Sequence, residues 1–169
     1  DSKGYEYKAK LTILKEAART LNYLTENNLL QYADLEKKVE DVHSSYDRTG
    51  KELKGVEARL REVQPLIKNI SNYQRLKPVY DAFQKAKDKP GFKAKHEAEL
   101  VIFEAARSTL LAMQGDEKLP SLKTLKAEQA QLFEEQERLY AERNRFKKEA
   151  KQIETIKSNV DTFLSPSAD

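Results

Sequence analysis

The sequence contains no cysteine and no tryptophan, and only five glycines and five prolines among its 169 residues. Without cysteine the chain can form neither disulfides nor thiolate metal sites, and a reducing compartment, the cytoplasm, is the expected location. No apolar run approaches the roughly 18–20 residues that cross a bilayer, and no signal peptide opens the chain. We therefore expect no membrane insertion.

The excess of positive over negative charge is also small, because the formal net charge is only +3. Averaged over the chain, this charge is too small to indicate any partner. Charged residues make up 35% and hydrophobic residues 38%, which is typical of an elongated helical protein with much surface. The length fits one helical domain, residues 1–169. Because the chain starts at Asp1 and not at Met, we expect a piece of a larger protein.

A repeat that averages 3.5 residues predicts a long helix over 34–75 with a narrow apolar seam, as in a coiled coil. Only Thr49 in this repeat is neither apolar nor aromatic. The repeat consists of Leu35, Val39, Val42, Tyr46, Thr49, Leu53, Val56, Leu60, Val63, Ile67 and Ile70. Such a helix is not stable alone in water, so another segment must cover its seam.

A second heptad repeat predicts that cover over 121–164. Its positions are Leu125, Leu132, Leu139, Phe146, Ile153 and Val160. We expect an all-α fold in which the two helices form an elongated antiparallel coiled-coil hairpin, with Tyr46 near Ile153, Leu53 near Phe146 and Ile67 near Leu132. A dimeric parallel coiled coil is the competing arrangement. The connection of about 45 residues is long enough to turn round, which favours the hairpin.

The remaining segments predict a helix at each end of this hairpin. Apolar residues at helical spacing over 5–25 indicate a helix that packs at the base, against the open ends of the long helices. Residues 77–120 predict a small helical knob at the tip. Pro78 is expected to start a new helix, residues 89–91 (Lys-Pro-Gly) to form a turn, and Ser121 to cap the last long helix.

Basic and aromatic residues alternate toward the tip and indicate a nucleic-acid contact. The candidates are Lys68, Arg75, Lys77, Lys85, Lys87, Lys89, Lys93 and Lys95, with the rings of Tyr73 and Tyr80. Cationic side chains neutralise phosphates, and exposed rings stack on unpaired bases. The competing interpretation is that the rings form the core of the knob and the lysines only keep it soluble.

No residue pattern indicates catalysis, a metal or a cofactor. His43 and His96 fall on different predicted elements, and the carboxylates follow the spacing of solvated helix surfaces. The sequence has no glycine-rich phosphate loop and no nucleophile elbow. We therefore expect no enzyme activity within this fragment, no catalytic residue, no metal ligand and no cofactor.

Several stretches, in order along nearly the whole chain, resemble the C-terminal region of bacterial relaxases, the mobilisation nucleases of conjugative and mobilisable elements such as plasmids. They are AARTLNYL at 17–24, YADLE at 32–36, NY at 72–73, KPVY at 77–80, KHEAE at 95–99, LPSLK at 119–123 and NVD at 159–161. In that family an N-terminal nuclease domain nicks one DNA strand at the transfer origin, with a tyrosine that becomes attached to the 5′ end and a histidine-bound metal.

The resemblance implies that this chain is the non-catalytic helical tail of such a protein. Nothing in it matches the nuclease motifs, so the nuclease domain is absent and none of the eight tyrosines is assigned a catalytic role. The implied function is conjugative DNA mobilisation, through DNA near the transfer origin, through proteins of the conjugation machinery, or through self-association. The alternative is a coiled-coil scaffold or dimerisation module without a nucleic-acid role.

Overall fold

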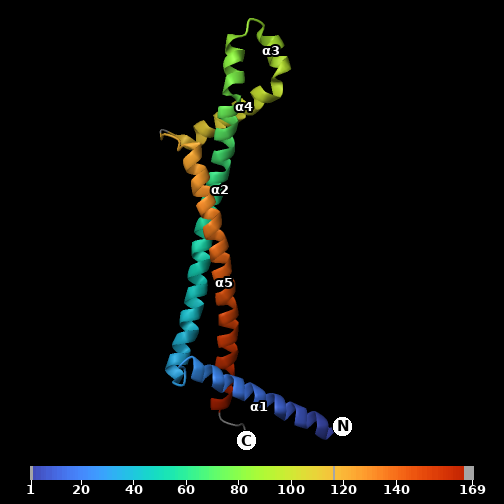
Figure 1. Ribbon diagram of the computed structural model, residues 1–169, viewed down its shortest axis with the longest axis vertical. Coiled ribbons are helices and arrows are strands. Elements are labelled where there is room, and N and C mark those ends of the chain that lie inside the picture. The colour runs from blue at the N-terminus through green and yellow to red at the C-terminus, as the bar shows by residue number, and fades with distance from the viewer. Residues whose placement is uncertain (1, 116, 166–169) are drawn as a thin grey trace. The chain divides into compact units, whose positions relative to one another are not determined.

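The computed structural model describes residues 2–115 and 117–165, and within these residues the protein is all-α, as predicted. Five helices follow one another along the described chain (Figure 1). They are α1 (Ser2–Glu26), α2 (Tyr32–Lys85), α3 (Lys89–Lys95), α4 (Glu97–Gln114) and α5 (Leu122–Leu164). None of these helices is long and apolar enough to cross a membrane.

The chain divides into two compact units, and both long helices contribute to each. Unit 1 comprises the residues up to Glu52 and those from Leu139 onward, and unit 2 comprises Leu53–Arg138. Within each unit the segments of α2 and α5 pack closely against each other, as in a helical hairpin.

The two segments are antiparallel in unit 1, because the early part of α2 meets the late part of α5. The hydroxyl of Tyr32 donates a 2.7 Å hydrogen bond to Asp161, whereas Gly50 lies against the guanidinium of Arg143. The segments of α2 and α5 are antiparallel in unit 2 as well. Arg59 of α2 binds Glu128 of α5, whereas Ile70, further along α2, shares a hollow with Ser121, which precedes α5.

The predicted seam of α2 is buried. Eight of its eleven positions are shielded from solvent, and Val39, Tyr46 and Ile67 are half-buried. The eight buried positions are Leu35, Val42, Thr49, Leu53, Val56, Leu60, Val63 and Ile70. Burying one such aliphatic side chain stabilises the fold by roughly 1.5–3 kcal/mol. This burial overcomes the low helix propensity of the glycines and prolines within α2.

The core of unit 1 joins α1, α2 and α5. Leu35 and Val42 cluster with Ile153 and Ile156, and Tyr23 and Leu24 of α1 pack on this cluster. The buried Thr20 accepts a 3.1 Å hydrogen bond from Asn159. The base helix predicted over 5–25 is therefore present as α1, and the residues near its C-terminal end attach it to the other two helices.

The structure shows which buried clusters the predicted pairs of side chains join. In unit 2, Ile67 and Leu132 both pack on the cluster of Val63, Ile70, Leu110 and Leu125. In unit 1, Ile153 clusters with Leu35 and Val42, whereas Tyr46 lies under the side chain of Arg143.

The helix expected to start at Pro78 is the continuation of α2, which runs through both Pro65 and Pro78 to Lys85. Each proline removes one backbone hydrogen bond at a cost of about 3 kcal/mol. The buried Leu76 lies close to Pro78 and its packing offsets that cost. The side chain of Asn69 donates a 2.8 Å hydrogen bond to the carbonyl of Pro65.

The prediction of a turn at 89–91 was wrong, because these residues begin α3. Asp88 caps this helix, and its carboxylate accepts a 3.1 Å hydrogen bond from the amide of Gly91. Pro90 stands in the first turn, where its fixed φ suits a helix start. The predicted cap at Ser121 is confirmed, since its Oγ accepts a 3.1 Å hydrogen bond from the amide of Thr124.

Candidate nucleic-acid interface

The predicted interface residues all lie in unit 2, on α2, on α3 and on the short connection between them. The cationic residues are called the basic surface below: Lys68, Arg75, Lys77, Lys85, Lys87, Lys89, Lys93 and Lys95. Figure 1 shows that α3 and α4 fold back beside the C-terminal end of α2. The fold thus brings the five lysines of 85–95 onto the end of α2, the connection after it and the short helix α3.

An aromatic stack supports this end of α2 from within. Phe103 of α4 is only 2% exposed, and its ring lies 5.1 Å from the ring of Tyr73 and 4.5 Å from that of Tyr80. The hydroxyl of Tyr80 accepts hydrogen bonds from Gln84 at 2.7 Å and from Arg107 at 3.3 Å. Such stacked pairs contribute about 0.5–1.5 kcal/mol beyond the area that they bury.

The structure therefore places Tyr73 and Tyr80 in the packing of α2 against α4. One face of each ring is covered by Phe103, and the guanidinium of Arg107 lies 5.8 Å from the centre of the Tyr80 ring. Both tyrosines are half-buried. The two rings hold together the helices that carry the cations. This agrees with the competing interpretation, in which the rings form the core of the knob.

A second aromatic group fixes α3. The rings of Phe83 and Phe92 lie 6.1 Å apart, and the His96 ring stacks on Phe92 at 4.4 Å. Nδ1 of His96 lies 3.3 Å from the carboxylate of Glu99. These contacts and the Asp88 cap hold a helix of only seven residues in place, although none of its own residues is fully buried.

The cations themselves are exposed and mostly lack acidic partners. All eight residues of the basic surface are exposed, and Lys77 pairs with Asp81 at 3.8 Å. Arg75 donates a 3.3 Å hydrogen bond to the neutral amide of Asn72. Among the described residues, the other six form no ion pair. Their positive charge is therefore available to an external anion.

An ion pair with two hydrogen bonds lies elsewhere in unit 2, between α2 and α5. Arg59 donates two hydrogen bonds to the carboxylate of Glu128, at 2.5 and 3.1 Å, and a third to Glu62 at 3.0 Å. The hydrogen bonds from Arg59 lower the pKa of Glu128, and those to Glu128 and Glu62 raise the pKa of Arg59. This arginine is committed to holding the hairpin together and is not a candidate for binding an external anion.

Metal-binding geometry is not seen in the part of the chain that the structure describes. Over 2–115 and 117–165, no group of three or more histidine, aspartate or glutamate side chains could hold a metal ion. His43 lies on α2 of unit 1, with Nε2 2.8 Å from the carboxylate of Glu154, whereas His96 lies in unit 2. The two histidines therefore stand in separate local environments.

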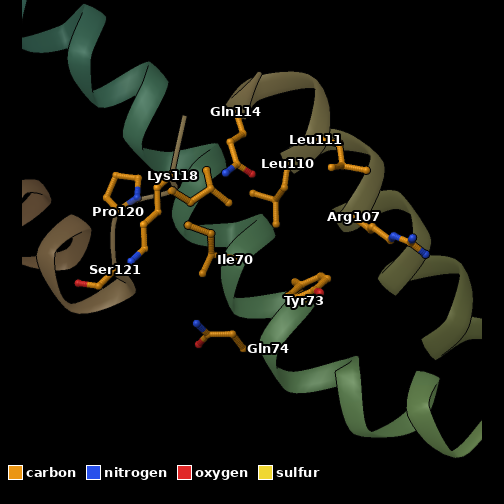
Figure 2. A pocket seen from close by; sticks show the side chains of 11 residues that line it. Ile70, Tyr73, Gln74, Arg107, Leu110, Leu111, Gln114, Lys118, Pro120 and Ser121 are labelled. Carbon is orange, nitrogen blue, oxygen red and sulfur yellow. The ribbon is translucent and has the colours of Figure 1, made fainter. Parts of the chain in front are cut away.

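The structure also contains a hollow that the sequence did not indicate. It has a volume of about 630 Å³ and lies in unit 2, between α2, α4 and the segment that leads into α5. Figure 2 shows Ile70 and Leu110 projecting toward each other from α2 and α4. From the sequence, residues 77–120 were expected to form a helical knob and Ser121 to cap the last long helix. No signal in the sequence placed the residues at 118–121 opposite Ile70.

Comparison of the chain with protein-family models, with curated proteins and with solved structures finds no match in any of the three.

Proposed function

We propose that this chain is a non-catalytic helical domain that contacts nucleic acid through the basic surface, as part of a relaxase in conjugative DNA mobilisation in the bacterial cytoplasm. The group of exposed lysines on the end of α2 and on α3 carries the proposal, because it has no acidic partners among the described residues. The resemblance of the sequence to the tail of relaxases supplies the biological setting.

Electrostatics favour phosphate as the target of this surface. A stretch of eleven residues, 85–95, contains five lysines and only one acidic residue, Asp88. The lysines are Lys85, Lys87, Lys89, Lys93 and Lys95. The carboxylate of Asp88 is engaged in capping α3. A protein that neutralises phosphates with such side chains releases condensed counterions, and this release drives binding that does not depend on sequence.

The contact is expected to position the protein on the backbone and not to read bases. Lysine is a flexible point charge, without the planar fork with which arginine recognises guanine. Tyr73 and Tyr80 are covered by Phe103, so base stacking on these rings contributes little. The role that follows is to hold a DNA strand or duplex near a partner that carries out the chemistry.

Fluorescence anisotropy with a labelled 25-nucleotide strand and the corresponding duplex tests this function. The first variant replaces Lys85, Lys87, Lys89, Lys93 and Lys95 by glutamine. A matched control replaces Lys8, Lys15, Lys37, Lys51 and Lys54, which are also exposed and also form no ion pair among the described residues. Both variants lower the formal net charge from +3 to −2.

We expect the wild type to bind at 50 mM NaCl and the first variant to lose at least about tenfold in affinity, which corresponds to about 1.4 kcal/mol. The control is expected to retain most of its affinity. Equal loss in both variants would show that only the net charge matters, and absence of binding by the wild type at low salt would reject the function.

A scaffold or dimerisation module is the second candidate, and a specific observation favours it. α1 exposes several large apolar side chains, among them Ile13 at 63%, Leu14 at 66% and Leu21 at 58%. Apolar groups that remain exposed on one helix are typical of surfaces that another protein covers. Light scattering over a concentration series tests this function, since a dimer that Leu14→Glu converts to a monomer would support it.

A further inference from the structure

The hollow in unit 2 combines apolar walls with positive charge. Its eleven lining residues come from α2, α4 and the segment before α5: Ile70, Tyr73, Gln74, Arg107, Leu110, Leu111, Gln114, Lys118, Leu119, Pro120 and Ser121. None of the described residues in the lining is acidic. Its volume of about 630 Å³ falls within the range of about 300–1,000 Å³ that is usual for ligand sites.

The apolar wall is partly closed and partly open. Ile70 and Leu110 are only 6% exposed and form the floor, whereas Leu111 on the rim is 63% exposed. A second, adjoining hollow shares the segment 118–120 and adds Leu66, the 43% exposed Met113 and charged residues of both signs, namely Arg59, Arg61, Glu62 and Glu117. Because the two hollows share that segment, they fit an elongated occupant better than a compact one.

The charge on the rim favours an anionic occupant. Figure 2 places Lys118 and Arg107 on opposite sides of the hollow. Lys118 is exposed and has no ion pair among the described residues, and Arg107 pairs with Glu104 only at 3.8 Å. α5 begins at the edge of the hollow with no acidic residue in its first turn, so the positive end of its dipole is not neutralised there.

Two amide side chains complete the site. Gln74 and Gln114 line the hollow, and neither forms a side-chain hydrogen bond with another described residue. An amide both donates and accepts hydrogen bonds, as the backbone of a bound peptide requires. A lipid tail or a simple hydrocarbon offers no hydrogen-bonding group to either amide.

We propose that this hollow binds a peptide segment of a partner protein in which a large apolar side chain lies within four residues of an aspartate or glutamate. The apolar side chain occupies the floor between Ile70 and Leu110. The acidic side chain pairs with Lys118. This site is separate from the basic surface, and it gives the domain a protein partner in addition to nucleic acid.

Selection from a displayed library of random 12-residue peptides, followed by anisotropy titration of the selected peptides, tests the proposal. Two variants change the rim: Leu111→Glu and Lys118→Glu. Two controls match them: Val101→Glu, which is 61% exposed on the same helix and outside this hollow, and Lys95→Glu on α3. All four positions are exposed, so the variants are expected to fold, and circular dichroism verifies this.

We expect selected peptides to carry an apolar residue beside an acidic one, and to bind Leu111→Glu and Lys118→Glu at least about tenfold more weakly than the wild type. The controls are expected to change affinity less than about twofold. A selection that yields no binders, peptides without acidic residues, or equal binding to the rim variants would overturn the proposal. Displacement of a selected peptide by oleate with equal affinity would assign the site to lipid instead.

The outcome is independent of nucleic-acid binding. The five-lysine variant at 85–95 leaves every residue of the hollow unchanged and is expected to bind the selected peptides as the wild type does. Loss of peptide binding in that variant would place the peptide on the basic surface and would also overturn the proposal.

Discussion

The guanidinium of Arg143 lies over the ring of Tyr46, with its central carbon 4.7 Å from the ring centre. This contact between α5 and α2 lies in the seam of unit 1, where Thr49 is the one position of α2 that is neither apolar nor aromatic. Nε of Arg143 is buried and has no hydrogen-bond partner among the described residues. A cation over an aromatic ring gains about 0.5–1 kcal/mol, whereas a buried donor without a partner costs about 1–3 kcal/mol.

Arg143→Met is therefore expected to stabilise the protein by about 1 kcal/mol, because methionine replaces the aliphatic stem of the arginine and removes the unpartnered donor. Urea unfolding measures the change. Arg145→Met is the control, since Arg145 also lies over a ring, that of Phe146, but is exposed. It is expected to change the free energy of unfolding by less than about 0.5 kcal/mol. Destabilisation by Arg143→Met would show that the cation contributes more than its burial costs.

Two helical glycines of α2 are expected to respond differently to larger residues. A Cβ at Gly55 would meet nothing within 4 Å, so Gly55→Ala should stabilise the helix by about 1 kcal/mol. Gly50 is buried, and a Cβ there would already lie 3.4 Å from the guanidinium of Arg143. Gly50→Leu should therefore destabilise the protein by about 1–3 kcal/mol, whereas Gly55→Leu should not. Equal effects of leucine at the two positions in urea unfolding would contradict the packing described for Gly50.

The ion pair between Arg59 and Glu128 predicts a dependence of stability on pH. The pKa of Glu128 is lower in the folded protein than in the unfolded chain, because Arg59 donates hydrogen bonds to its carboxylate. The stabilisation is therefore complete above the ordinary carboxyl pKa and is lost as the pH falls through the lowered value.

Glu128→Gln should reduce the free energy of unfolding by about 0.5–1 kcal/mol at pH 7 and by less at pH 3, since both partners are partly exposed to solvent. Glu134→Gln is the control, because Glu134 is exposed on the same helix and forms no ion pair among the described residues. A loss that is the same at pH 3 and pH 7 would contradict the role of the carboxylate charge.

The cap of α3 predicts the local stability of the helix that carries three lysines of the basic surface. Asp88→Ala removes the acceptor for the amide of Gly91 and should weaken α3 by about 1 kcal/mol, or about fivefold in amide exchange over 91–95. Asp88→Asn retains an acceptor and should preserve protection. Gly91→Ala should also weaken the helix, because its Cβ would collide with the carboxylate of Asp88. Unchanged exchange in Asp88→Ala would show that the aromatic contacts alone hold α3.

The periodicity of the sequence was sufficient to predict the all-α fold. Leu35, Val63 and Leu125 are among the most deeply buried side chains, and each belongs to a heptad position predicted from spacing alone. The spacing of apolar residues predicts long paired helices well, because the seam must face its partner helix at every turn and the pattern therefore repeats. One polar residue at a seam position does not hide such a repeat.

Features that depend on one residue or on a distant contact were harder to predict. Pro78 marks a helix start in most local contexts, but packing around Leu76 keeps α2 continuous through it. The carboxylate of Asp88 caps the start of α3. The sequence did not indicate this cap, because residues 89–91 (Lys-Pro-Gly) are typical of a turn. The cations of the basic surface could be identified from the sequence. The stacking of Phe103 on Tyr80 could be seen only in the three-dimensional structure.

The salt dependence of DNA binding tests whether the basic surface contacts nucleic acid. The logarithm of the binding constant falls linearly with the logarithm of the salt concentration, by about 0.9 for each phosphate neutralised on a duplex and about 0.7 on a single strand. Titrations between 50 and 200 mM NaCl should give a slope of about −3 or steeper for the wild type. The variant without the lysines of 85–95 should give a clearly shallower slope. Binding with the same slope in both proteins, or binding that salt does not weaken, would contradict the assignment of the nucleic-acid contact to the basic surface.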